Sequence, residues 1–160
     1  MRITSSHLLS ESRDFGCYTR MKKKRLNGHR FKLKVGRSRT GLGLFAREEI
    51  KRGVRIVEYT GRVLRPGEEY TSRSKYLFEV TKTKTIDGRL KSNRARYINH
   101  SCAPNCTPHN TGRRIFIVAK RRIEPGEELT YNYGKEYFDE HIKKKGCRCL
   151  KCQPIELVLD

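Results

Sequence analysis

The chain has 160 residues, of which 34% are charged and 35% are apolar, and its formal net charge is +20. This length suits one domain with a modest core, and no apolar run approaches membrane-spanning length. The amino terminus also lacks a secretory signal, so we expect no membrane contact and a reducing, intracellular location, nuclear in a eukaryote and cytoplasmic in a prokaryote.

The amino-terminal residues 1–30 are predicted to form a basic extension, because Ser, Arg and Lys dominate and apolar periodicity is absent. The stretch from Phe15 to Arg47 contains no Asp or Glu, and Arg20–Arg25 is almost entirely basic. Such a run is either a solvated arm or a contact for a polyanion such as nucleic acid. Charge alone gives these two interpretations equal weight.

Beyond this extension, short apolar runs alternate with turn signals, which predicts a mainly β domain with short helices. Strands are predicted at residues 31–35, 54–59, 76–80 and 114–118. Turns are predicted at Pro66-Gly67, Asp87-Gly88 and Pro125-Gly126. Residues 135–145 have helical composition, with Phe138 and Ile142 on one face, and Gly146 ends the segment.

Two weak motifs stand early in this domain. Thr40 precedes a Gly41-Leu42-Gly43 triplet, whose glycines would let the backbone approach a ligand closely. It is not a dinucleotide-binding fingerprint, since no third glycine opens a helix. Tyr59 ends a predicted strand before Thr60-Gly61. Taken alone, the first is an ordinary turn and the second a half-exposed strand tyrosine.

Two later segments are more specific. Residues 96–106 read Arg-Tyr-Ile-Asn-His-Ser-Cys-Ala-Pro-Asn-Cys, and residues 131–134 read Tyr-Asn-Tyr-Gly. Together with the earlier motifs, in this order, they resemble the signatures of SET-domain protein lysine methyltransferases. The resemblance runs from about Phe31 to Cys152. It implies a SET domain over residues 31–134 and a post-SET segment and tail over residues 135–160.

The resemblance also implies a site for S-adenosylmethionine. The positions that match the family's cofactor contacts are Thr40, Gly41, Leu42, Tyr76, Arg96, Asn99 and His100. Leu42 stands where the family often has Trp. In the family, the Asn-His pair binds the cofactor's amino group and adenine, and the residue matched by Tyr76 contacts its methionine part.

Three tyrosines match the family's lysine-binding positions. Tyr133 would orient the amine and the methyl group, while Tyr59 and Tyr131 would hold the amine. Tyr131 occupies the position that tunes the number of methyl groups, and a tyrosine there predicts mainly monomethylation. Asn132 replaces the family's usual Asp between the two tyrosines.

The cysteines predict a metal site. Cys147, Cys149 and Cys152 lie within six residues, and zinc needs a fourth ligand, for which Cys102 is the natural candidate. This set matches the family's post-SET zinc site, although the second gap has two residues where the family usually has four. The alternatives are free thiols, or a nucleophile made by Cys102 and His100, which we discount because near neighbours in sequence rarely face each other productively. Cys17 and Cys106 have no assigned role.

The resemblance further implies small sheets and a carboxyl-terminal pseudoknot that places Asn99 beside Tyr133, a rare kind of threading. A protein substrate follows from it, such as a histone tail or another basic DNA-associated protein. Two other classes remain: a zinc-stabilised basic nucleic-acid-binding module, in which the basic extension makes the contact, and an inactive SET-like recognition scaffold. Three intact tyrosines argue against the scaffold.

Overall fold

The computed structural model describes residues 31–154 and is a mainly β structure with short helices. Its strands are β1 (Leu33–Ser38), β2 (Gly41–Ala46), β3 (Arg55–Tyr59), β4 (Arg62–Val63), β5 (Leu77–Thr81), β6 (Lys84–Asp87), β7 (Asn99–His100), β8 (Cys106–Asn110), β9 (Ile115–Ala119) and β10 (Thr130–Tyr131). Its helical segments are α1 (Glu68–Thr71), η1 (Arg94–Tyr97), α2 (Lys135–Tyr137), η2 (Phe138–Ile142) and η3 (Lys143–Lys145). No helix within the described range is long and apolar enough to cross a membrane.

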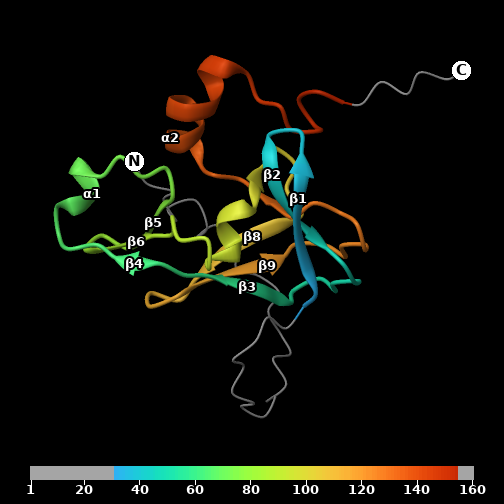
Figure 1. Ribbon diagram of the computed structural model, residues 1–160, viewed down its shortest axis with the longest axis horizontal. Helices are drawn as coiled ribbons and strands as arrows, with labels where there is room; N and C mark the ends of the chain where they lie inside the picture. The colour runs from blue at the N-terminus through green and yellow to red at the C-terminus, as the bar shows by residue number, and fades with distance from the viewer. Residues whose placement is uncertain (1–30, 155–160) are drawn as a thin grey trace, which may run out of the picture.

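The strands form four small sheets rather than one large sheet (Figure 1). Strands β3, β9 and β8 make a central antiparallel sheet, and β4, β6 and β5 make another that carries α1 at its end. The β1–β2 hairpin lies on the opposite side of the central sheet in this view, and α2 lies above the sheets. Because the sheets are small and their strands are short, strand ends and connecting segments from several sheets can contribute to one site.

The fourth sheet is a parallel pair of two-residue strands, β7 and β10. Its register places Thr130 opposite Asn99 and Tyr131 opposite His100. The Ser101 amide extends the pairing by donating to the carbonyl of Tyr131 at 3.1 Å. This pairing brings the two most specific sequence motifs side by side, as the predicted pseudoknot requires.

The core is a single cluster of aliphatic and aromatic side chains contributed by β2, β3, β5, β9 and the segments around them. Leu44, Ile50, Ile115, Ile117 and Leu129 are fully buried. In β9 the burial alternates along Ile115–Ala119, because successive strand residues point to opposite faces. Tyr59 and Tyr131 belong to the same cluster, so the core positions the tyrosines directly.

The four predicted strands are confirmed as β1, β3, β5 and β9, with boundaries shifted by at most three residues. The turns at Pro66-Gly67 and Pro125-Gly126 are confirmed, but the turn predicted at Asp87-Gly88 is wrong. Asp87 is instead the buried last residue of β6, because its carboxylate is held by neighbouring hydrogen bond donors. The predicted extension at residues 1–30 lies outside the described residues.

The predicted helix over residues 135–145 is present as three consecutive short segments, α2, η2 and η3. The middle segment, Phe138–Ile142, is a π-helix, a rare form that inserts an extra residue into the turn. Gly146 ends the series with a φ of 77°, a left-handed value that favours glycine.

Candidate active site and cysteine cluster

A tyrosine-rich pocket opens where β3, η1, β10 and α2 meet. Its lining residues are Tyr59, Lys75, Tyr76, Arg96, Tyr131, Tyr133 and Tyr137. All three tyrosines that the sequence predicted as lysine-binding residues line it, together with two of the predicted cofactor residues, Tyr76 and Arg96. The pocket therefore contains residues of both the predicted lysine-binding site and the predicted cofactor site.

Two of the three tyrosine hydroxyls are fixed by backbone carbonyls. The Tyr133 hydroxyl donates to the carbonyl of Ile98 at 2.7 Å, and the Tyr59 hydroxyl donates to the carbonyl of Tyr76 at 2.9 Å. The rings of Tyr131 and Tyr133 lie with centroids 4.9 Å apart. Within the described residues the Tyr131 hydroxyl makes no hydrogen bond, so it can serve a ligand in the pocket.

Burial keeps these hydroxyls protonated. Desolvation is the main reason why the pKa of Tyr59, of Tyr131 and of Tyr133 lies well above the ordinary value of a tyrosine. The charge of Asp87 further raises the pKa of Tyr59. At neutral pH the pocket is thus lined by neutral hydroxyls that orient a guest without adding negative charge.

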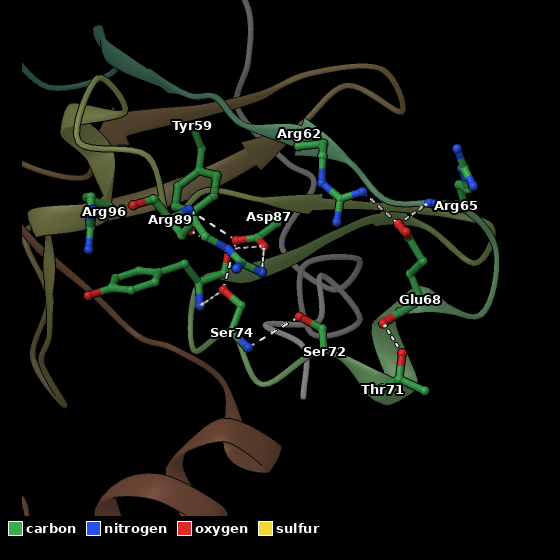
Figure 2. A network of polar contacts seen from close by, with 11 residues as sticks. Tyr59, Arg62, Arg65, Glu68, Thr71, Ser72, Ser74, Asp87, Arg89 and Arg96 are labelled. Atoms are coloured by element: carbon green, nitrogen blue, oxygen red, sulfur yellow. Dashed lines mark hydrogen bonds and ion pairs between the residues drawn. The ribbon is translucent and has the colours of Figure 1, made fainter.

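A polar network behind the pocket is centred on Asp87 (Figure 2). The Asp87 carboxylate accepts hydrogen bonds from the Ser74 hydroxyl at 2.8 Å and from the Arg89 side chain at 2.6 Å. Burial alone would raise the pKa of Asp87, but these donors outweigh it and hold the pKa below its usual range. The Gly88 amide donates to the Tyr76 carbonyl at 2.9 Å, so the network fixes the backbone that Tyr59 also contacts.

Arg96 connects this network to the pocket. Its guanidinium lies over the Tyr76 ring, 4.3 Å from the centroid, and donates to the carbonyl of Arg89. Its Nε atom is buried and has no hydrogen bond partner in the described part of the chain. A buried donor without an acceptor is costly, so this atom favours a ligand with an acceptor or a negative charge.

Asn99 connects the β1–β2 hairpin to the β7–β10 pair by hydrogen bonds. Its two Nδ2 hydrogens are shared among three acceptors, the Leu42 carbonyl at 3.0 Å, the Ser38 hydroxyl at 3.0 Å and Glu128 Oε1 at 2.6 Å. A Cβ atom on Gly43 would lie only 2.4 Å from Glu128 Oε1, so a side chain there would disturb this junction. The predicted cofactor motif is thus linked to Asn99 through the backbone of the hairpin.

His100 stands between the tyrosine pocket and the cysteines. Its Nδ1 accepts a hydrogen bond of 3.2 Å from the Tyr133 amide, which assigns the ring proton of the neutral imidazole to Nε2. Nε2 lies 3.4 Å from the Cys102 sulfur. Burial lowers the pKa of His100, in agreement with a neutral ring.

The contact between His100 and Cys102 corrects one step of the sequence argument. Neighbours in sequence do face each other here, so geometry is no reason to discount a nucleophilic pair. The reason lies in the sulfur's surroundings. The Cys102 sulfur belongs to a cluster with the thiols of Cys147, Cys149 and Cys152, so it is not an isolated partner of His100.

Four cysteine sulfurs form one cluster. The sulfurs of Cys102, Cys147, Cys149 and Cys152 all lie within 4.8 Å of one another. Cys102 Sγ is 3.8 Å from Cys147 Sγ and 3.6 Å from Cys152 Sγ. Tetrahedral zinc with Zn–S bonds of about 2.3 Å separates its sulfurs by about 3.8 Å, so the cluster fits a zinc ion.

The fifth of the described cysteines, Cys106, differs from the four in this cluster. Cys106 is fully buried in the core, and burial raises the pKa of its thiol to about 12. Its sulfur is not one of the four that lie within 4.8 Å of one another in the described part of the chain. It is therefore an inert core residue, and Cys17 lies outside the described residues.

The remaining predicted residues lie near the pocket rather than in it. Thr40, Gly41 and Leu42 form the tip and first residues of the β1–β2 hairpin, where Leu42 is 54% exposed. They join the pocket through Asn99 and the parallel β7–β10 pair. Of the predicted cofactor residues, Tyr76 and Arg96 line the pocket, Leu42 is linked to Asn99 by a hydrogen bond, and Thr40 and Gly41 lie at the hairpin tip.

Two residues that line the pocket, Lys75 and Tyr137, were not predicted from the sequence. Tyr137 packs edge-on against Tyr133, with ring centroids 4.9 Å apart, and lies 4.5 Å from the ring of His141. The four-residue spacing of Tyr137 and His141 was a helical signal that could have revealed this face. Lys75 carried only its place beside Tyr76, which is too weak a signal.

Comparisons with known proteins identify this arrangement. A family model described as SET domain matches residues 41–134. The chain therefore belongs to the SET-domain family. It is also similar to a chain in the crystal structure of polycomb repressive complex 2 from Chaetomium thermophilum, with a TM-score of 0.58 and 30% identity, over 66% of this chain and 15% of that chain.

Named relatives agree with this family. The chain is 37% identical over 128 residues to human histone-lysine N-methyltransferase 2D and 40% identical over 125 residues to histone-lysine N-methyltransferase ASHH3 of Arabidopsis thaliana. It is 39% identical over 121 residues to the H3 lysine-4 specific histone-lysine N-methyltransferase of Schizosaccharomyces pombe. These matches cover 72%, 68% and 68% of this chain but only 2%, 34% and 13% of those proteins.

Proposed function

We propose that this chain is a protein-lysine N-methyltransferase that uses S-adenosylmethionine. The observation that carries the proposal is the position of Tyr133. Its hydroxyl is held by the Ile98 carbonyl and its amide by His100, so it stands where the cofactor motif meets the tyrosine pocket. The family membership and the names of the relatives support the same reaction class.

When bound, S-adenosylmethionine would supply a sulfonium-bound methyl group for in-line displacement. The residues proposed to hold it are Thr40, Gly41, Leu42, Tyr76, Arg96, Asn99 and His100. The unpartnered Arg96 Nε fits such a ligand, because the cofactor carries a carboxylate. The chain's own task is then to present a neutral amine in line with the methyl group.

The tyrosines suit that task. A free lysine has a pKa of about 10.4, so its amine must lose a proton before it can attack. An apolar channel beside a cationic sulfonium favours the neutral amine. Protonated hydroxyls of Tyr59, Tyr131 and Tyr133 can orient the nitrogen lone pair without a negative charge that would retain the ammonium form, and the gain is mainly positional.

We further propose that the main product is monomethyl-lysine. Tyr131 is 2% exposed, and its hydroxyl is free within the described residues to bond the amine directly or through an ordered water. That bond occupies the space that a methylated amine needs in order to turn. A second transfer is therefore disfavoured.

We propose one zinc ion per chain, held by Cys102, Cys147, Cys149 and Cys152. The short separations of the four sulfurs support this proposal. The His100 Nε2 proton points to the Cys102 sulfur, as outer hydrogen bond donors do at metal sites. The ion would then fix the post-SET segment next to the tyrosine pocket.

The proposed substrate is a lysine in a histone tail or another basic, DNA-associated protein. The relatives are named histone-lysine N-methyltransferases, which supports this class and a nuclear, chromatin-associated location in a eukaryote. The net charge of +20 would help the chain approach DNA-bound substrates, and the basic segment at residues 1–30 is the proposed nucleic-acid contact.

The decisive experiment incubates the purified full chain with isotope-labelled S-adenosylmethionine and free histones, nucleosomes and unrelated basic proteins. Mass spectrometry should find labelled monomethyl-lysine in at least one histone. Binding of the cofactor without transfer to any protein would favour the recognition scaffold. DNA binding without cofactor binding would favour the nucleic-acid-binding module and contradict the proposal.

A further inference from the structure

Positive charge is concentrated in two segments of the described chain. Residues 31–47 and residues 141–154 contain no Asp or Glu, whereas elsewhere arginines such as Arg114 pair with nearby carboxylates. The two acid-free segments hold ten Lys and Arg residues. Among these ten, only Lys143 has an ion pair within the described residues, with Asp139 at 3.7 Å. The ten are Lys32, Lys34, Arg37, Arg39, Arg47, Lys143, Lys144, Lys145, Arg148 and Lys151.

A hydrogen bond joins these two segments. The Arg39 guanidinium, at the tip of the β1–β2 hairpin, donates to the carbonyl of Gln153. Figure 1 shows this hairpin tip beside the carboxyl-terminal segment, which is drawn in red. The Gln153 amide donates in turn to the carbonyl of Cys149 at 2.9 Å, and the Cys152 amide donates to the same carbonyl at 3.0 Å. The carboxyl-terminal segment is therefore a folded turn at the hairpin tip rather than a solvated arm.

Five exposed cations lie around this junction, and we call them the basic surface. They are Arg37 and Arg39 of the hairpin and Lys145, Arg148 and Lys151 of the carboxyl-terminal segment. Lys145, Arg148 and Lys151 lie within two residues of cysteines whose sulfurs are all within 4.8 Å of one another. The cysteine cluster therefore keeps these three cations close together, and the Arg39 hydrogen bond places them beside the hairpin.

The side chains of these segments favour one kind of partner. Protein–protein interfaces are depleted in Lys and enriched in aromatic side chains, and surfaces for single-stranded nucleic acid stack bases on aromatic rings. The large apolar side chains that the two segments expose are Leu42 and Leu150, neither of which is aromatic. Double-stranded DNA instead presents a dense row of phosphates, about one negative charge per 1.7 Å of helix axis, which unpaired Lys and Arg side chains can neutralise.

We infer that the basic surface binds the phosphate backbone of double-stranded DNA. The contact does not read the DNA sequence, because contacts to phosphates position a protein but carry no base information. This surface is separate from residues 1–30, and the inference goes beyond the proposed function, since this binding needs no methyl transfer. Residues 135–154 also supply Tyr137 to the tyrosine pocket. DNA bound on the basic surface would therefore keep the pocket near proteins that are bound to the same DNA.

The test is fluorescence anisotropy of the full chain with a short labelled DNA duplex at several salt concentrations. The logarithm of the binding constant falls linearly with the logarithm of the salt concentration, with a slope of about −0.9 for each phosphate contact. The triple variant Lys145→Gln, Arg148→Gln, Lys151→Gln should bind at least about tenfold more weakly at about 0.1 M salt and reduce the magnitude of the slope by about 2–3. Each single change should reduce it by about 0.9, which keeps the inference testable if the triple variant fails to fold.

The matched control replaces three exposed cations outside the basic surface, Lys51→Gln, Arg52→Gln and Lys120→Gln, and so removes the same charge. It should keep the slope of the wild type. Equal losses in the two triple variants, or no loss in the first, would overturn the inference. So would tighter binding to poly-glutamate or to phosphatidylserine vesicles than to DNA, because the surface would then fit an acidic protein or a membrane. The expected DNA binding without any methyl transfer would support this inference and contradict the proposed function.

Discussion

The hydroxyl of Tyr133 donates a 2.7 Å hydrogen bond to the backbone carbonyl of Ile98, the residue directly before the Asn-His pair. This bond joins the end of the last strand to the motif that precedes it by some thirty residues. It sets the direction of the hydroxyl inside the pocket, while the Tyr133 amide is set independently by His100. The backbone and the hydroxyl of Tyr133 therefore have separate supports.

Replacing Tyr133 with Phe tests whether its hydroxyl is needed for methyl transfer. The ring should stay packed against Tyr137 and Tyr131, but the hydroxyl that we propose to orient the reacting groups is lost. We expect methyl transfer to fall about a hundredfold, with binding of S-adenosylmethionine nearly unchanged. Single-turnover kinetics and titration of the same sample separate the two effects. Near-normal turnover would remove Tyr133 from this role.

We expect Tyr131 to govern the number of methyl groups that are added to the lysine. Phe at this position removes the hydroxyl that is free to bond the amine, so a methyl group can occupy the vacated space. Loss of one hydrogen bond is worth about 0.5–1.5 kcal/mol, or roughly three- to tenfold in product partition. Tyr131→Phe should shift the product from monomethyl- to di- and trimethyl-lysine in mass spectra. Abundant trimethyl-lysine from the wild type, or an unchanged distribution, contradicts the prediction.

Much of the site could be predicted from the sequence because its key residues stand in two short, ordered motifs. The parallel pairing of β7 with β10 could not come from periodicity, since each strand has only two residues. Such a short strand has no hydrophobic alternation, and its partner lies some thirty residues away. The strands with longer apolar alternation, β3 and β9, were found within one residue.

Asp87 and Lys75 show where pattern reasoning failed. An Asp-Gly pair is a common turn signal, yet Asp87 ends a strand and is 2% exposed. Its burial depends on donors from Ser74 and Arg89, which no local pattern reveals. Lys75 is an exposed lysine, and nothing around it in the sequence predicts a pocket. It lines the pocket because the fold places it beside Tyr76 and Arg96.

The Asp87 network predicts a pH-dependent stability. The folded-state pKa of Asp87 lies below its unfolded value, so the unfolded chain binds more protons as the pH falls. The stabilisation is present above the unfolded pKa, near 4, and is lost as the pH falls through the folded pKa. Asp87→Asn should lower the free energy of unfolding by about 1–3 kcal/mol at pH 7, and less at pH 3.

Urea unfolding at several pH values measures this difference. Glu58→Gln is a suitable control, because Glu58 forms a more exposed ion pair with Arg114 on the central sheet. Its loss should cost no more than about 1 kcal/mol. A pH-independent deficit in Asp87→Asn would mean that the carboxylate's charge has no part in the stabilisation.

The backbone around Gly61, two residues after Tyr59, leaves no room for a side chain. A Cβ atom there would lie 2.2 Å from the Asp87 carbonyl oxygen and 2.9 Å from Gly88 Cα, both of which are backbone atoms. Gly61→Ala should therefore lower the free energy of unfolding by about 1–3 kcal/mol and reduce activity by displacing the neighbouring Tyr59. Gly36→Ala is the matched control, since its Cβ would meet only the Phe45 ring at an ordinary 3.4 Å. Equal stability of the two variants in thermal unfolding would contradict this expectation.

We expect removal of the zinc ion to loosen the carboxyl-terminal segment. If zinc holds Cys102 and the three carboxyl-terminal cysteines together, the ion also stabilises the segment that carries Tyr137, because folding and metal binding are coupled. Freshly purified protein should contain one zinc per chain by atomic emission, and a chelator should lower both activity and the protection of residues 135–154 from hydrogen exchange. Cys149→Ser should lose the metal, whereas Cys106→Ala should keep it, because the buried Cys106 lies outside the cluster. Absence of zinc from unchelated protein, or a Cys149→Ser variant with a full complement of zinc, would exclude this four-cysteine site.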